Sequence, residues 1–185
     1  MTEWLKWTAP PAIVLSVASP VYATQYVTVE QAQKLAFSEA TQFVWAPVVY
    51  TPAQITAIEK LSGQRVLTRG EQVWKAERDK RFLGFFIVDY VIGKHLAIDY
   101  AVALDPQGRV SRVEILNYRE AYGGEIRDAD WLKQFVGKTS HDPLAPGRDI
   151  RIISGATLSS RHVTEGIKRV LALYQIVLRH TADDK

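Results

Sequence analysis

The chain has 185 residues, of which 47% are hydrophobic and 23% are charged, a composition typical of a globular protein. Its formal charge of +3 is small and its basic residues are mixed with acidic ones, which argues against a nucleic-acid-binding protein. Cysteine is absent, which excludes disulfides, thiolate nucleophiles, iron–sulfur clusters and CxxCH haem attachment. Redox chemistry would therefore need an organic cofactor or a metal held by nitrogen and oxygen ligands.

Residues 1–23 are predicted to be a secretory signal peptide that is cleaved from the mature protein. Lys6 precedes an apolar run over residues 12–18, and Val21-Tyr22-Ala23 then forms a cleavage site. An uncleaved anchor is the alternative, but the run is shorter than the roughly 20 apolar residues that span a bilayer. We therefore expect an exported, periplasmic protein whose mature form begins near Thr24.

Two helices are predicted in the N-terminal part of the mature chain, residues 24–65. Thr28 and Gln31 have the spacing of a capping box at the start of the first helix. Thr51 caps the second, with Pro52 at its first helical position. The residues expected to face inward are Ala32, Leu35, Ala36 and Ala40 in the first helix and Ile55, Ile58 and Leu61 in the second.

Residues 66–180 are predicted to form the sheet and the ligand-binding core. Aromatic and β-branched residues become frequent from residue 66, as in strands, and Asp105-Pro106-Gln107-Gly108 has a turn sequence. The expected strands are 73–77, 82–91, 97–104 and 109–116, followed by helices near 130–136 and 159–178. The fold class is therefore α+β, an antiparallel sheet of four or five strands in hairpins, packed with helices and followed by a long C-terminal helix.

The segment before the last helix, residues 153–160, has the features of a phosphate site. Its glycine and alanine allow close approach to the backbone, and the start of a helix attracts anions. The hydroxyls that gather there belong to Ser154, Thr157, Ser159 and Ser160. The flanking cations are Arg148, Arg151 and Arg161. The alternative is that these Ser and Thr residues only cap the helix.

Ser154-Gly155-Ala156-Thr157 resembles the flavinylation motif of the FMN-binding domain family. This family includes the FMN-carrying subunits of Rnf-type and Na+-translocating NADH:quinone reductase complexes. The similarity extends over about residues 82–174, and residues 120–124 and 135–138 correspond to two further family segments. In the family, a transferase joins FMN through its phosphate to the last Thr of the motif. The resemblance thus implies a covalent phosphoester-threonyl FMN on Thr157, although Arg151 stands where members usually carry Asp.

Residues 24–185 are expected to form one FMN-binding domain with no catalytic residue. No metal site is expected either, because His141, His162 and His180 do not have the spacing of metal ligands. The implied cofactor-binding residues are Ser154, Gly155, Ala156, Thr157, Leu158, Ser159, Glu120, Tyr122, Gly123 and Arg151. Tyr122 is expected to stack on the isoalloxazine ring or, alternatively, to pack in its turn.

The function implied is that of an exported electron-transfer protein, for which the resemblance allows membrane association through its partners, and no role for nucleic acid is expected. Its partners would be an FMN transferase and a redox protein such as a membrane quinone-linked reductase or a periplasmic cytochrome. Two alternatives are a flavin-dependent reductase acting directly on a small substrate or metal chelate, and a non-redox accessory domain.

Overall fold

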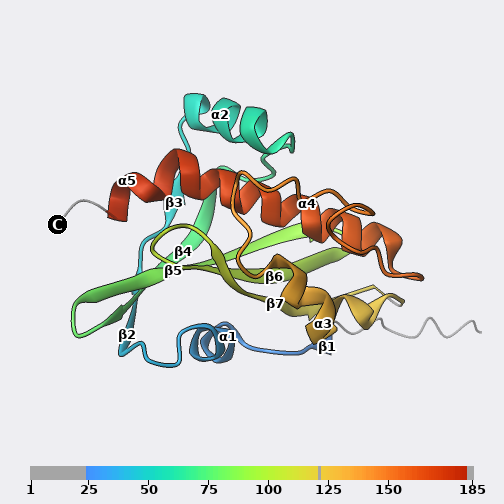
Figure 1. Ribbon diagram of the computed structural model, residues 1–185, viewed down its shortest axis with the longest axis horizontal. Coiled ribbons are helices and arrows are strands. Elements are labelled where there is room, and N and C mark those ends of the chain that lie inside the picture. Colours follow the sequence, from blue (N-terminus) through green and yellow to red (C-terminus); the bar gives the residue numbers. More distant parts are fainter. Residues whose placement is uncertain (1–23, 121, 183–185) are drawn as a thin grey trace, which may run out of the picture.

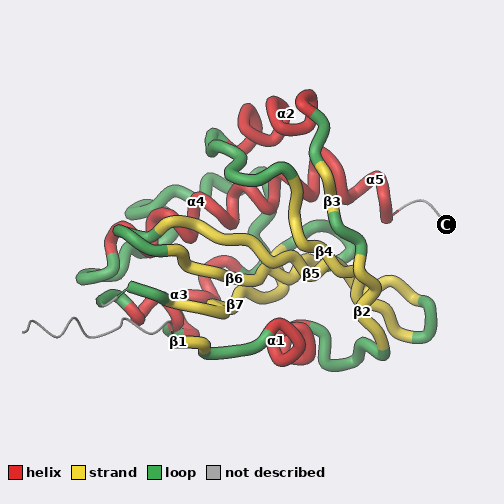
Figure 2. The backbone as a smooth tube through the Cα atoms, turned by 180° about the vertical axis from the view of Figure 1, so that it is seen from behind, coloured by secondary structure: helices red, strands yellow, loops and turns green. Residues whose placement is uncertain are grey.

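The computed structural model describes residues 24–120 and 122–182, which form an antiparallel sheet with helices on both faces (Figures 1 and 2). The strands are β1 (Thr24–Gln25), β2 (Gln42–Trp45), β3 (Val48–Val49), β4 (Gly70–Arg78), β5 (Arg81–Ile92), β6 (Ala97–Leu104) and β7 (Val110–Tyr118). The helices are α1 (Val29–Ala36), α2 (Pro52–Ser62), η1 (Gly124–Arg127), α3 (Ala129–Leu132), η2 (Lys133–Phe135), α4 (Thr157–Leu173), η3 (Tyr174–Leu178) and α5 (Arg179–Ala182). The predicted α+β fold is confirmed.

The four strands predicted from the sequence, β4 to β7, form the centre of the sheet. Strand order is β1-β7-β6-β5-β4-β2, and β3 pairs with β4 beside β2. The three strands that were not predicted, β1, β2 and β3, have only two to four residues and are too short to show an alternating pattern. The N-terminal part, predicted only as helical, therefore also contributes strands to the sheet.

Both N-terminal helices begin as predicted. Thr28 and Gln31 form a reciprocal capping box at α1, and Thr51 and Gln54 form another at α2. Each box satisfies two backbone N–H groups that the first turn of a helix leaves without partners. Gly63 ends α2 with φ of 68°, a conformation that glycine adopts without strain.

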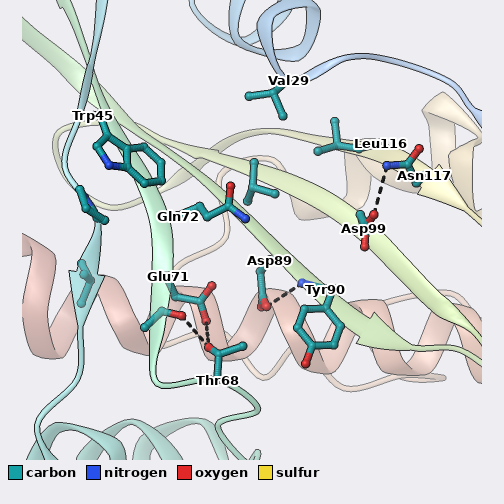
Figure 3. A pocket seen from close by; sticks show the side chains of 14 residues that line it. Val29, Trp45, Thr68, Glu71, Gln72, Asp89, Tyr90, Asp99, Leu116 and Asn117 are labelled. Carbon is teal, nitrogen blue, oxygen red and sulfur yellow. Dashed lines mark hydrogen bonds between the residues drawn. The ribbon is translucent and has the colours of Figure 1, made fainter.

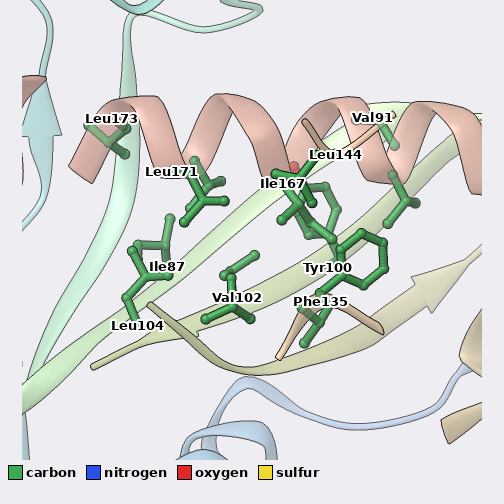
Figure 4. Close-up of a cluster of buried hydrophobic side chains, with 14 of the residues drawn as sticks. Ile87, Val91, Tyr100, Val102, Leu104, Phe135, Leu144, Ile167, Leu171 and Leu173 are labelled. Carbon is green, nitrogen blue, oxygen red and sulfur yellow. The ribbon is translucent and has the colours of Figure 1, made fainter. Parts of the chain in front are cut away.

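Side chains of the central strands alternate between two buried layers. From β6, Tyr100 and Val102 face the layer under α4, whereas Ala101 and Ala103 face α1 (Figures 1 and 4). The layer under α4 is the larger, because α2, α3 and η2 also contribute to it. The site described below lies at the start of α4, which this layer holds against the sheet.

Two leucines that were expected to face inward do not, and that prediction is wrong. Leu35 of α1 is 50% exposed and Leu61 of α2 is 41% exposed. α1 has only eight residues and buries Ala32 instead, while α2 packs on α4 and η3 and fully buries Ile58. A short helix buries a narrower face than helical periodicity alone suggests.

The C-terminal helix begins two residues earlier than expected, at Thr157. It runs as α4 along β5 and β6, passes through the π-helical segment η3 and ends as α5. Its Gly166 lies so close to the sheet that a Cβ there would fall 2.2 Å from the Tyr100 hydroxyl. None of the helices in residues 24–120 and 122–182 has the length and apolar character needed to cross a bilayer.

A buried ion pair joins α4 to the sheet. The Arg169 Nη2 atom lies 2.6 Å from Asp89 Oδ2, and the Tyr100 hydroxyl donates to the same oxygen at 2.6 Å. The Arg169 side chain is 6% exposed and the Asp89 side chain is 1% exposed, so neither charge is solvated by water. The attraction between the two charges offsets this loss of solvation. Glu71 of β4 is buried close by and accepts a hydrogen bond from Thr68.

Glu71 makes stability pH-dependent in a predictable direction. Burial, together with the negative charge of Asp89, raises its pKa from 4.5 to about 8. The folded protein therefore keeps this proton at pH values where the unfolded chain has released it, so the free energy of unfolding falls as pH rises through this window, by up to about 1.4 kcal/mol per pH unit. We expect Glu71→Gln to flatten this slope in urea unfolding between pH 5 and 8. Glu39→Gln, at an exposed site, is the control, and an unchanged slope in Glu71→Gln would contradict the assignment.

Candidate functional site

The start of α4 differs from the starts of α1 and α2 because it has no side-chain cap. Its N-cap residue is Ala156, and no described side chain accepts a hydrogen bond from the N–H groups of its first turn. Alanine is among the weakest N-cap residues, so the N–H groups of this turn are left to solvent or to a ligand. The positive end of a 17-residue helix is thus available to an anion.

Of the four hydroxyl-bearing residues expected to gather at this helix start, two are buried and two are exposed. Ser160 is buried and donates to the Thr157 carbonyl at 3.2 Å, and Ser159 is buried 3.2 Å from the Tyr118 hydroxyl. Ser154 and Thr157 are exposed. The expectation that these serines act as caps is wrong, because the two buried ones form hydrogen bonds within the fold and Ser154 lies in the turn before the N-cap residue Ala156.

Gly155 and Gly123 shape the turn in different ways. Gly155 has φ of 84°, and a Cβ there would meet nothing within 4 Å. Gly123 has φ of 92°, and a Cβ there would lie 2.6 Å from the Tyr118 hydroxyl and 3.0 Å from the Ala156 Cβ. Gly123 therefore lets two parts of the chain pack together, whereas Gly155 leaves open space above the backbone.

A cavity of about 630 Å³ lies over this turn. Its lining residues are Lys94, His95, Glu120, Tyr122, Gly155, Ala156, Thr157, Leu158 and Ser159. Seven of the ten residues predicted from the sequence are therefore brought together around one space. Ser154, Gly123 and Arg151 do not line the cavity, although Gly123 supports its wall. The volume is in the ordinary range for a small-molecule or cofactor site.

Two lining residues, Lys94 and His95, were not found from the sequence. They lie at the tip of the hairpin between β5 and β6, far from the motif along the chain. The hairpin itself was predicted, but nothing in its sequence indicates that its tip reaches the start of α4. Lys94 and His95 reach the cavity because β5 and β6 pair in the sheet, and the spacing of residues along the chain does not indicate this.

Glu120 connects the hairpin tip to the cavity wall. Its Oε1 atom accepts hydrogen bonds from the backbone N–H of His95 at 2.5 Å and of Leu96 at 2.8 Å. Partial burial alone would raise its pKa, but the backbone N–H groups of the hairpin tip, together with the charge of His95, outweigh burial and hold the pKa below its usual value. Glu120 is therefore an ionised carboxylate whose charge is engaged by backbone.

The loop before the motif is fixed by other contacts. The indole N–H of Trp131 donates to the Arg151 carbonyl at 2.6 Å, and the Arg151 side chain is exposed. Asp149, two residues earlier, accepts from the Ala145 N–H at 2.7 Å and from Lys138 Nζ at 3.1 Å. Trp131 is fully buried, so it serves the core and does not line the cavity.

A second cavity, of about 510 Å³, lies across the sheet beside α1 (Figure 3). Trp45, Gln72 and Asn117 are among its lining residues, and none of the residues predicted as site residues borders it. Its three carboxylates are already engaged within the protein, Glu71 by Thr68, Asp89 by Arg169 and Tyr100, and Asp99 by Arg119 and Asn117. The cavity at the start of α4 is therefore the better candidate.

The geometry at the start of α4 fits a ligand with a phosphate group and a flat ring. The uncapped helix turn and the open space above Gly155 suit the phosphate, and the exposed Thr157 hydroxyl lies at the same place. Tyr122, whose side chain is 87% exposed, offers an aromatic face at the rim.

Residues 93–172 match the FMN-binding domain family. Among solved structures, the fold is similar to that of NqrC from Shewanella oneidensis, with a TM-score of 0.52, 16% identity, and coverage of 81% of this chain and 74% of that one. No curated protein is significantly similar in sequence. The matched segment includes the hairpin tip, Glu120 and the start of α4.

Proposed function

We propose that this protein holds FMN in the cavity at the start of α4 and acts as an electron carrier, a proposal supported by the match of residues 93–172 to the FMN-binding domain family. The observation that carries the proposal is the uncapped first turn of α4, with its exposed Thr157, inside the matched segment. The flavin supplies the redox chemistry, and the protein anchors and orients it.

Each part of the cavity has a role in this proposal. The N–H groups at the start of α4 bind the phosphate, and Gly155 leaves room for it. Tyr122 and the hairpin tip lie where they can contact the ring system.

We further propose that FMN is attached covalently, through a phosphoester between its phosphorus and Thr157 Oγ1. The transferase would use a flavin dinucleotide as donor, so that the bond between its two phosphates breaks as the bond to Oγ1 forms, the other nucleotide leaves as its monophosphate and the Thr157 hydroxyl loses its proton. The Thr157 side chain is exposed at the first position of α4, so a transferase can reach it in the folded protein. A covalent link would also suit an exported protein, which could not replace a cofactor lost by dissociation. The side chain of Arg151, which stands where family members usually carry Asp, is exposed on the approach to this turn.

Coexpression with an FMN transferase tests both proposals. Purified protein should be yellow, and its intact mass should exceed that of the polypeptide by one FMN less one water. Colourless protein from such a host would overturn FMN binding and favour a non-redox accessory domain. Rapid turnover of small substrates or metal chelates by the yellow protein, without a redox partner, would favour a reductase.

The proposed carrier is exported and exchanges electrons with another redox protein, such as a membrane quinone-linked reductase or a periplasmic cytochrome. Export rests on the signal sequence in residues 1–23, which lie outside the described residues. We expect N-terminal sequencing of the protein from its natural compartment to begin near Thr24. Recovery of membrane-bound protein that retains Met1 would contradict cleavage and support an anchor.

Gly155→Val is expected to reduce FMN content. The φ of 84° at this position is strained for any L side chain, by about 1–2 kcal/mol, and a branched side chain would occupy the space proposed for the phosphate. Gly137→Val is a matched control, because Gly137 has φ of 82°, has no atom within 4 Å of a Cβ and does not line the cavity.

Flavin absorbance per protein, measured together with urea unfolding, separates the two effects. Both variants should lose stability, but only Gly155→Val should lose flavin. Equal flavin content in the two variants would show that the phosphate does not lie above Gly155.

A further inference from the structure

The tip of the β5–β6 hairpin, Gly93 to Leu96, is clamped from two sides. Glu120 accepts hydrogen bonds from the His95 and Leu96 N–H groups on one side. On the other, His162 Nδ1 of α4 lies 2.6 Å from the Ile92 carbonyl oxygen. Gly93 is required for this packing, because a Cβ there would lie 2.8 Å from Glu120 Oε1. The tip is therefore held in position beside the cavity even though it is exposed.

The clamp leaves Lys94 as a cation available to a ligand. Glu120 is the carboxylate that lines the cavity, and its pKa is lowered by the backbone N–H groups that it binds. Lys94 is exposed, lines the cavity and forms no ion pair with any described residue. The cavity thus has the helix start as an anion site and a lysine on the hairpin tip.

Reduction changes the charge of a flavin ring. When a chemical reductant such as dithionite delivers two electrons and one proton is taken up, the ring gains one negative charge. A fixed cation beside the ring would bind this form more tightly than the neutral oxidised form, which raises the reduction potential. A cation beside the phosphate would instead bind both forms equally, because the phosphate charge does not change.

We propose that Lys94, positioned by Glu120, faces the flavin ring and raises its reduction potential. This inference rests on the proposed FMN site and adds a role for two residues in the carrier. Glu120 acts as a positioning residue, since it binds the backbone of the hairpin tip.

The test compares Lys94→Gln with Lys60→Gln, which removes an exposed lysine from α2, away from the cavity. The FMN-loaded proteins are titrated with dithionite against a reference dye. We expect Lys94→Gln to reduce the preference for reduced over oxidised flavin roughly tenfold, a decrease of about 30 mV for a two-electron couple. Lys60→Gln should match the wild type. An unchanged potential in Lys94→Gln, even with weaker FMN binding, would overturn the proposal and place Lys94 at the phosphate.

Glu120 is tested by a double-mutant cycle, because its own charge also affects the flavin. Lys94→Gln should retain its tenfold effect in a Glu120→Gln background, where the amide oxygen can still accept the two hydrogen bonds. In a Glu120→Ala background the effect should fall below about twofold. An undiminished effect there would refute the positioning role.

Hydrogen exchange of the flavin-free protein gives a readout that does not depend on the cofactor. The His95 and Leu96 amides should exchange faster in Glu120→Ala and at the wild-type rate in Lys94→Gln. Unchanged exchange in Glu120→Ala would overturn the clamp. Wild-type protein that binds no FMN would overturn the proposed function itself, whereas normal binding with an unchanged potential in Lys94→Gln would overturn this inference alone.

Discussion

Thr157→Ala is expected to abolish covalently bound flavin when the protein is coexpressed with an FMN transferase. The substitution removes the exposed hydroxyl that lines the cavity at the start of α4. The neighbouring Ser159 and Ser160 are buried and held by the protein, so they cannot replace it. Since Thr157 does not cap the helix, the fold should be retained. Flavin fluorescence on a denaturing gel and peptide mass mapping measure the result.

Two matched variants sharpen this prediction. Thr157→Ser keeps a hydroxyl and should retain some covalent flavin, and Ser154→Ala removes an exposed hydroxyl outside the cavity and should retain all of it. Full labelling of Thr157→Ala would contradict the assignment. A yellow wild-type protein that loses its flavin on denaturation would show binding without the link, and Arg151→Asp would then be expected to restore attachment.

Arg169→Met is expected to destabilise the protein by about 3–5 kcal/mol, because it leaves Asp89 buried without its charged partner. Asp89 would retain the hydrogen bond from Tyr100, which is not enough to replace an ion pair in a site 1% exposed to water. Urea unfolding measured by circular dichroism at neutral pH gives the change in the free energy of unfolding.

The control is the exposed ion pair between Arg78 and Glu39, whose side chains are about half exposed. Arg78→Met should cost about 1 kcal/mol or less. Replacing both Arg169 and Asp89 by apolar residues should cost less than Arg169→Met alone, because no charge is then left unpaired. A loss in Arg169→Met similar to that in Arg78→Met would show that water reaches this ion pair.

Sequence patterns correctly predicted those elements whose stabilising hydrogen bonds join residues only a few positions apart. The capping residues Thr28 and Thr51 marked helix starts correctly, because capping involves atoms only three residues apart. The turn after Asp105 formed as expected, with its carboxylate accepting from the Gln107 and Arg109 N–H groups.

The elements that were missed depend on contacts between distant segments. Strand β2 exists because Gln42 to Trp45 pair with β4, some thirty residues later in the chain. Lys94 lines the cavity because the pairing of β5 with β6 brings the hairpin tip beside Glu120, which binds it. Its position at a helix start predicts Ser159 to be a capping residue, but its hydroxyl lies beside the Tyr118 hydroxyl. The pattern of neighbouring residues does not indicate that Tyr118 is buried there.

Strand β1 determines what a tether at the N-terminus would do. Thr24 pairs with Tyr118, only two residues before Glu120, so the chain enters the domain beside the cavity. A leader retained in a membrane would therefore hold the cavity close to the bilayer, whereas cleavage would leave the cavity free of that tether. For the same reason, an affinity tag fused ahead of Thr24 would crowd the cavity. A tag placed after α5 would begin beside β4, where Lys75 binds the Thr181 carbonyl, at a site remote from the cavity.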